Sequence, residues 1–97
     1  MKTITVTKED IQESRERMRV CVNHHEAIYL TPVAIALQKA GYARAWTERL
    51  SGMMGWTDGE KGICGTMGDD VRQFLLRHDN YLPVEPVTFQ VELYKAA

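Results

Sequence analysis

The feature that most constrains this chain is a short apolar helix whose two ends are both marked by the residues around it. Thr31 can accept hydrogen bonds from the free N–H groups of a first turn, which is the role of an N-cap residue. Pro32 follows at the first helical position, where a missing N–H costs nothing. Gly41 stands where a left-handed residue commonly ends a helix. We therefore predict a buried helix over Pro32–Ala40, with small residues that let neighbours approach closely.

The N-terminal part of the chain predicts a strand followed by a helix. Lys2–Thr7 alternates apolar and polar residues and is rich in β-branched side chains, as a half-buried strand is. Thr7 and Asp10 have the spacing of a capping box, with Asp10 in the place of the more usual glutamate. The helix expected over Lys8–Met18 has a thin apolar stripe, so we expect it to lie on the surface.

The glycine-rich middle of the chain leaves alternatives open. Tyr42–Thr47 alternates between two faces and favours a strand, although the residues of Ala43–Leu50 also suit a helix. Asp58-Gly59 is a common pair in a two-residue hairpin turn. It predicts a hairpin between Met54–Trp56 and Lys61–Cys64. The competing interpretation of this segment is a glycine-rich loop.

The C-terminal part predicts a second well-marked helix and a long strand. Asp69 or Asp70 is expected to cap the helix, which ends near Asn80 because prolines follow. The apolar stripe of this helix is formed by Val71, Phe74, Leu75 and His78. Alternation over Val87–Tyr94 predicts a strand whose core-facing residues are Val87, Phe89, Val91 and Leu93. We expect this face to pack against the stripe, with Val33 and Leu37 nearby.

These elements define an α+β fold built on one domain, residues 1–97. A chain of 97 residues has room for one core, and 44% hydrophobic and 26% charged residues are ordinary values for a globular domain. We expect a small mixed sheet of three to five strands, with two packed helices and one surface helix. Two cysteines are too few for a disulfide scaffold, so we expect a reducing, cytoplasmic setting.

Three segments in this order resemble a group of small uncharacterised proteins of phage and actinobacterial genomes. They are Ile4–Thr7, the Pro-Val-Ala-Ile-Ala-Leu helix that begins at Pro32, and Val71–Leu75 leading to the Val-x-Pro-x-x-Phe strand at Val84–Phe89. The resemblance spans about half of the chain and names no activity. It implies the same order of elements and a phage or prophage accessory protein.

Charge and hydropathy limit the classes of partner. The net charge is −1, so the whole molecule does not attract phosphate, and we expect nucleic acid not to be the partner. A local basic face remains the alternative, formed by Arg15, Arg17, Arg19 and Arg44, although acidic residues are interleaved with the first three. No apolar run approaches the ~20 residues that span a bilayer, so we expect no membrane insertion.

The cysteines and histidines do not form a convincing chemical motif. Cys21, His24 and His25, with Cys64 and His78 elsewhere, could be assembled into a zinc site, but structural zinc sites usually show two closely spaced ligand pairs. A nucleophile pair of Cys21 and His25 lacks an orienting third residue. We therefore predict no catalytic residues, no metal and no cofactor. A Cys/His-dependent enzyme is the less favoured alternative.

The best candidate binding surface is the aromatic and methionine-rich middle of the chain. Such side chains are enriched in adaptable interfaces, and the set consists of Trp46, Met53, Met54 and Trp56, with Arg44 beside them. The competing interpretation is that these large side chains fill the core of a small domain. The interface interpretation predicts a non-enzymatic interaction protein. The resemblance adds a host or phage protein as partner, and an inhibitor or modulator of a host protein or defence system as the role.

The last strand also suggests self-association. If Val87–Tyr94 pairs on one side only, its free edge can pair with a second copy of the chain. A two-fold dimer is the commonest closed assembly, so we expect a homodimer.

Overall fold

The computed structural model describes residues 2–23, 25–58, 60–91 and 94–95 of the chain. The described residues form three α-helices and two antiparallel sheets, which confirms the α+β class. The N-terminal half contains β1 (Lys2–Val6), α1 (Lys8–Arg19), the short 3-10 helix η1 (Ala27–Tyr29) and α2 (Pro32–Lys39). The rest contains β2 (Ala43–Glu48), β3 (Met53–Asp58), β4 (Lys61–Thr66), α3 (Asp69–Asp79), β5 (Val87–Val91) and β6 (Tyr94–Lys95). The strand interpretation of the segment after Gly41 and the hairpin that follows are both confirmed.

The strands form two antiparallel sheets rather than the one mixed sheet expected. β1 pairs with β5, and the other sheet has the order β2-β3-β4-β6. The strand expected over Val87–Tyr94 is therefore wrong in its last part, because β5 ends at Val91 and Tyr94 pairs with Cys64 of the second sheet. The apolar alternation continues past Val91 and carries no sign of this change of sheet. Leu93, expected to face the core, lies outside the described residues.

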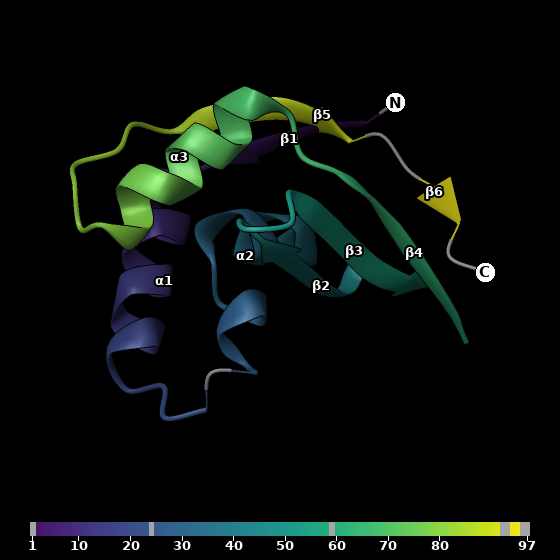
Figure 1. The fold of residues 1–97 in the computed structure, drawn as a ribbon, viewed down its shortest axis with the longest axis horizontal. Coiled ribbons are helices and arrows are strands. Elements are labelled where there is room, and N and C mark those ends of the chain that lie inside the picture. The colour runs from purple at the N-terminus through teal and green to yellow at the C-terminus, as the bar shows by residue number, and fades with distance from the viewer. Residues whose placement is uncertain (1, 24, 59, 92–93, 96–97) are drawn as a thin grey trace.

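Helix α2 is the centre of the fold. Residues 32–37 are all buried, so this helix is covered on every side. Figure 1 shows α2 between the β1–β5 pair with α3 above it and the β2–β3–β4 sheet beside it. The expected packing of α3 against β5 is confirmed, because one core cluster joins Val33, Leu37, Val71, Phe74, Leu75, Phe89 and Val91.

The predicted caps of α1 and α2 are present. Thr31 Oγ1 accepts a hydrogen bond from Ala34 N at 3.1 Å, and the same hydroxyl is hydrogen-bonded to that of Thr47 on β2. In α1, Asp10 N donates to Thr7 Oγ1 at 3.2 Å and Thr7 N donates to Asp10 Oδ2 at 2.9 Å. Two backbone N–H groups at the start of α1 are thereby satisfied by side chains.

The cap predicted for α3 is wrong. Gly68 is the N-cap residue, and Asp69 and Asp70 lie inside the first turn. Asp70 Oδ1 accepts a hydrogen bond from the adjacent Val71 N at 2.9 Å. Both carboxylates still lie at the positive end of the helix dipole, which accounts for acidic residues at this place without a capping bond.

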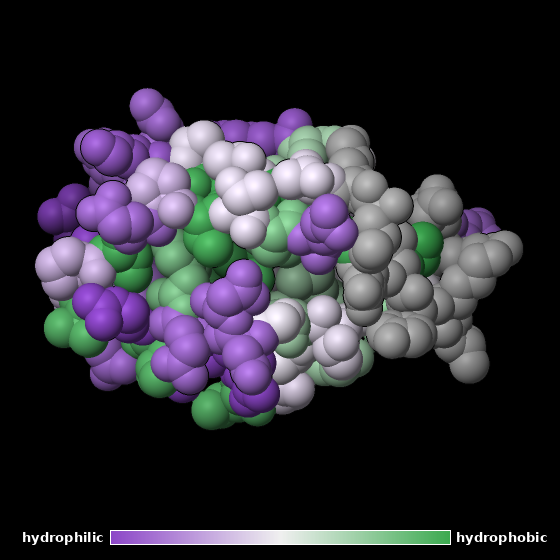
Figure 2. Space-filling model, turned by 90° about the horizontal axis from the view of Figure 1, so that it is seen from above, coloured by the Kyte–Doolittle hydropathy of each residue, from purple (hydrophilic) through white to green (hydrophobic). Residues whose placement is uncertain are grey.

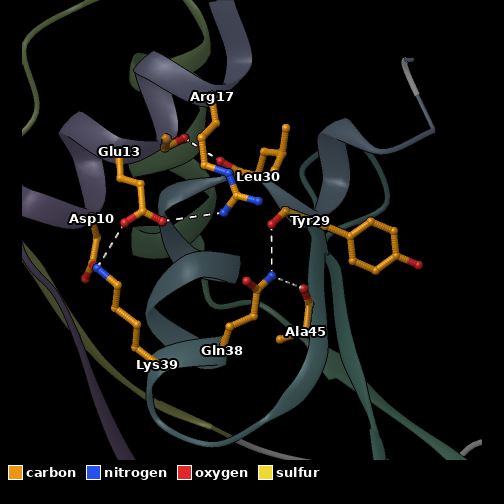
Figure 3. A network of polar contacts seen from close by, with 9 residues as sticks. Asp10, Glu13, Arg17, Tyr29, Leu30, Gln38, Lys39 and Ala45 are labelled. Carbon is orange, nitrogen blue, oxygen red and sulfur yellow. Dashed lines mark hydrogen bonds and ion pairs between the residues drawn. The ribbon is translucent and has the colours of Figure 1, made fainter. Parts of the chain in front are cut away.

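A polar network holds α1 against α2 (Figure 3). Lys39 Nζ lies 2.8 Å from Asp10 Oδ1 and 3.4 Å from Glu13 Oε1. Glu13 also pairs with Arg17 one turn further along α1, at 3.5 Å. The Asp10 side chain is 4% exposed, so its charge is compensated mainly by Lys39 and by the cap bonds.

A second set of hydrogen bonds in the same view ties η1 to its neighbours. Ser14 Oγ donates to the Leu30 carbonyl at 2.5 Å. Gln38 Nε2 donates to the carbonyls of Tyr29 and Ala45, both at 2.9 Å (Figure 3). Gln38 thus joins η1 to the edge strand β2, and α1 is fixed in place beside them.

A helix that crosses a bilayer needs about 20 predominantly apolar residues. Over the described ranges, none of the helices is both long enough and apolar enough to cross a bilayer.

Candidate functional site

The aromatic and methionine residues expected to bind a partner lie mostly inside the fold. Met54 and Trp56 are 2% and 5% exposed and belong to the core. Trp46 and Met53 are half-buried, and Arg44 is exposed. Met54 and Trp56 therefore fill the core, which is the competing interpretation that the sequence left open.

Close packing explains why these aromatic side chains are held in place. Trp46 lies opposite Gly55 across the β2–β3 pair, and a Cβ atom on Gly55 would come within 2.8 Å of the Trp46 ring. The rings of Tyr42 and Trp56 lie 4.3 Å apart with their planes at 58°. Gly55 is thus a glycine because the indole occupies the space of a side chain.

The expected cysteine and histidine candidates are distributed over different elements. Cys21 follows α1, Cys64 lies on β4 and His78 lies in the last turn of α3. His25 is exposed on the connection before η1, and His24 lies outside the described residues. Within the part of the chain that the structure describes, no three His, Cys, Asp or Glu side chains lie close enough to hold a metal ion.

A groove of about 910 Å³ lies between α1 and the end of α3. We call it the α1–α3 groove. Its apolar lining is provided by Ile11 and Met18 of α1, by Ala27 of η1 and by Tyr81 just after α3. Figure 2 looks down on the α3 side, and hydrophobic residues lie among hydrophilic ones at the left end of that face. The groove therefore offers both apolar and polar contacts to a partner.

The charges of the α1–α3 groove are unevenly compensated. Its cations are Lys8, Arg15 and Arg19, and its carboxylates are Glu16 and Asp79. Asp79 is held by Arg49, whose Nε lies 3.0 Å from its Oδ2. Burial would raise the pKa of Asp79, but the contacts with His78 and Arg49 outweigh it and the pKa is lowered. Asp79 is therefore ionised and already paired.

Two buried polar groups on the groove lack hydrogen-bond partners. His78 is 4% exposed, and both of its ring nitrogens are unpaired among the described residues. Its Nδ1 lies 3.5 Å from Asp79 Oδ1, without the geometry of a hydrogen bond. Arg15 Nε is also buried and unpaired, although Arg15 Nη2 donates to the Leu82 carbonyl at 2.7 Å. Unpaired buried polar groups are uncommon in native proteins and call for a partner, such as a water molecule, an ion or a bound ligand.

Tyr81 has a strained backbone at the rim of the groove. The φ angle of Tyr81 is +58°, and the residue is 85% exposed. Tyr81 N donates to the His78 carbonyl at 3.0 Å and Leu82 N donates to the Arg77 carbonyl at 2.9 Å. These two bonds form a Schellman motif, in which glycine usually fills the left-handed position. Tyr81 stands there instead.

Helix α2 ends in the same motif with the usual residue. Tyr42 N donates to the Leu37 carbonyl at 3.0 Å, Gly41 N donates to the Gln38 carbonyl at 3.1 Å, and Gly41 has a φ of +100°. The two helices thus end in the same motif, and they differ in the residue at the left-handed position. A tyrosine holds the strained position although its side chain is almost fully exposed and contributes little to the core.

The structure brings together three residues that the sequence suggested for other roles. Arg15 and Arg19 belong to the basic face considered for nucleic acid, and His78 was assigned to the apolar stripe of α3 and to a zinc set. All three line the α1–α3 groove. Tyr81 was missed, because a positive φ at a non-glycine residue leaves no mark in the sequence.

Comparison of the chain with protein-family models, with curated proteins and with solved structures gives no significant match. The candidate site therefore rests on the geometry described above.

Proposed function

We propose that this chain is a non-enzymatic interaction protein that holds a segment of a partner protein in the α1–α3 groove. The groove combines apolar side chains from α1 with cations and with an exposed tyrosine. Interfaces are enriched in tyrosine, methionine and arginine, and all three line this groove. The binding site of the proposal thus differs from the surface of Trp46 and Met53 that the sequence favoured.

The observation that carries the proposal is the left-handed, exposed Tyr81. A non-glycine residue at positive φ lowers the stability of the free protein, and an exposed ring gains little from burial in return. Partner binding gives the ring a function, because a tyrosine in a desolvated contact is among the commonest contributors to affinity.

Affinity capture tests this proposal through matched variants. Tagged wild-type protein, Tyr81→Gly and Leu50→Ser are used to capture proteins from the host lysate, followed by mass spectrometry. Leu50 is 78% exposed and lies on the β2–β3 connection, outside the groove. We expect a partner that is captured by the wild type and by Leu50→Ser and lost with Tyr81→Gly. An unchanged set of captured proteins with Tyr81→Gly would overturn the proposal.

The resemblance described above supplies the class of partner. A phage or prophage accessory protein would act on a host or phage protein, as an inhibitor or modulator in the cytoplasm. These finer statements are supported by the resemblance and by the small size of the chain alone.

The homodimer remains a separate proposal. Within the described residues β5 pairs with β1 alone, over Val87–Val91, so its other edge is the place where a second copy would pair. Light scattering at micromolar concentration tests it. A single mass near 11.1 kDa would exclude the dimer.

A further inference from the structure

We infer that the occupant of the α1–α3 groove is an acidic peptide segment, in which a carboxylate side chain stands next to an apolar one. This inference rests on the proposed function and names the chemistry of the partner. Three features of the groove carry it: uncompensated positive charge, unpaired buried donors and an apolar rim.

The free charge of the groove is positive. Asp79 is paired with Arg49, so Glu16 is the carboxylate of the groove lining that is left to balance Lys8, Arg15 and Arg19. Over the described ranges, neither Lys8 nor Arg19 forms an ion pair or a side-chain hydrogen bond. An anionic segment that lies along α1 therefore meets cations that have no other described partner.

The unpaired donors fit a carboxylate. A guanidinium binds a carboxylate through two parallel N–H groups, and the Nε of Arg15 has no partner. An imidazole carries at least one N–H group that can donate, and neither ring nitrogen of His78 has a hydrogen-bond partner among the described residues. Because the Nε of Arg15 is buried, a partner reaches it only if the Arg15 side chain shifts. The described hydrogen bond that resists this shift is the single one to Leu82.

The apolar rim requires a hydrophobic neighbour beside the carboxylate. Tyr81 presents an exposed ring, and Met18 is a flexible side chain that adapts to irregular contacts. A nucleic acid fits the groove less well than a peptide, because its phosphate backbone offers no hydrophobic side chain to this rim. The observations thus favour an acidic peptide over a nucleic acid.

Fluorescence anisotropy with defined probes tests the inference on the full chain. The first probe is a labelled ten-residue peptide that alternates aspartate with leucine and phenylalanine. The second replaces every aspartate by asparagine, and the third is an oligothymidylate of ten nucleotides. We expect the acidic peptide to bind at least tenfold more tightly than either of the others at 50 mM salt. Its affinity should fall several-fold at 300 mM salt, because the added ions screen exposed charges.

Variants test whether the peptide binds in the α1–α3 groove or responds only to the overall charge of the protein. Arg19→Gln should weaken binding of the acidic peptide at least threefold, and Arg15→Gln at least tenfold. Arg72→Gln should leave binding unchanged, since Arg72 is exposed on α3 but lies outside the groove. Circular dichroism shows whether each variant is folded, and Arg19→Gln removes an exposed cation without a described structural contact.

The outcomes separate this inference from the proposed function. Equal binding of the aspartate and asparagine peptides, or a preference for the oligonucleotide, would overturn the inference that the occupant is an acidic peptide. If Arg72→Gln and Arg19→Gln weakened peptide binding equally, the acidic peptide would not bind in the α1–α3 groove. If the acidic peptide does not bind while Tyr81→Gly still abolishes partner capture, the proposed function stands and this inference fails.

Discussion

Lys39 Nζ lies 2.8 Å from Asp10 Oδ1, and this contact joins the last turn of α2 to the first turn of α1. Asp10 also completes the capping box with Thr7, so one carboxylate fixes both the start of α1 and its position against the central helix. Since α1 forms one wall of the α1–α3 groove, this ion pair helps to set the shape of the candidate site.

Asp10→Asn should lower the free energy of unfolding by about 1–2 kcal/mol. The substitution removes the charge that accepts the Lys39 hydrogen bond, and hydrogen bonds to charged groups contribute energies of this order. The loss stays moderate because the Lys39 side chain is 52% exposed and water solvates it after the change. Urea denaturation measures the effect. Glu13→Gln is the matched control, and we expect a change within about 0.5 kcal/mol because its side chain is 39% exposed.

Acidic pH should destabilise the protein through the same carboxylate. Burial would raise the pKa of Asp10, but Lys39 and the Thr7 hydrogen bonds outweigh it and lower the pKa from its ordinary 3.8. The unfolded chain therefore binds a proton at a higher pH than the folded one. The stability contributed by Asp10 is complete well above pH 3.8 and is lost as the pH falls through that value toward the lowered pKa.

Urea denaturation between pH 5 and pH 3 measures this dependence. Asp10→Asn should lose less stability over that range than the wild type, because it no longer carries this titrating group. The wild type and the variant would instead lose equal stability if Asp10 contributed nothing to the acid dependence.

The order of elements could be predicted because local signals mark it. Thr31, Pro32 and Gly41 define α2 almost to the residue, and the Thr7–Asp10 pair defines the start of α1. The division into two sheets could not be predicted, since the apolar alternation runs on unchanged from Val91 past the point where the chain leaves β5. Strand periodicity reports which face is buried and carries no information on the partner strand.

The candidate site was harder to predict than the fold. Trp56 and Met54 look like interface residues by type, and their burial depends on how β3 packs in the tertiary structure. Arg15 and His78 are far apart in the sequence and meet at the groove only through the packing of α1 and α3. The feature that singles out Tyr81 at the groove is a positive φ, which Arg44 on β2 shares outside it, and the residue pattern does not show this angle.

Gly55→Ala should destabilise the protein by about 1–3 kcal/mol, the usual cost of overpacking a close contact. The new Cβ would lie 2.7 Å from the Ile63 carbonyl oxygen and 2.8 Å from the Trp46 ring. Gly62→Ala is the matched control on the neighbouring strand, because its Cβ would meet nothing within 4 Å. Thermal unfolding of the two variants measures the difference. Equal melting temperatures would mean that Trp46 does not require a glycine opposite it.

Phe89→Ala should cost about 3–5 kcal/mol, as expected for removal of a buried aromatic side chain. Phe89 is 7% exposed and belongs to the core cluster that joins β5 to α2 and α3. Domains of this kind have about 5–15 kcal/mol of stability, so much of the margin is lost. The adjacent Gln90→Ala, at an exposed position, should stay within about 0.5 kcal/mol. An unchanged thermal midpoint for Phe89→Ala would contradict the assignment of this core.

Tyr81→Gly should raise the free energy of unfolding by about 0.5–1 kcal/mol while it abolishes partner binding. Glycine adopts the φ of +58° without steric cost, and the greater freedom of the unfolded chain offsets only part of this gain.

Gly41→Ala is the matched control for Tyr81→Gly, because Gly41 holds the equivalent position of α2 at a φ of +100°. There the alanine should cost about 1 kcal/mol, since it takes on the strain that Tyr81 carries in the wild type. Urea denaturation measures both variants, and capture measures binding. If Tyr81 served the fold, its replacement by glycine would lower the free energy of unfolding. A stabilising Tyr81→Gly that no longer captures the partner would show that the strain at Tyr81 is retained for binding.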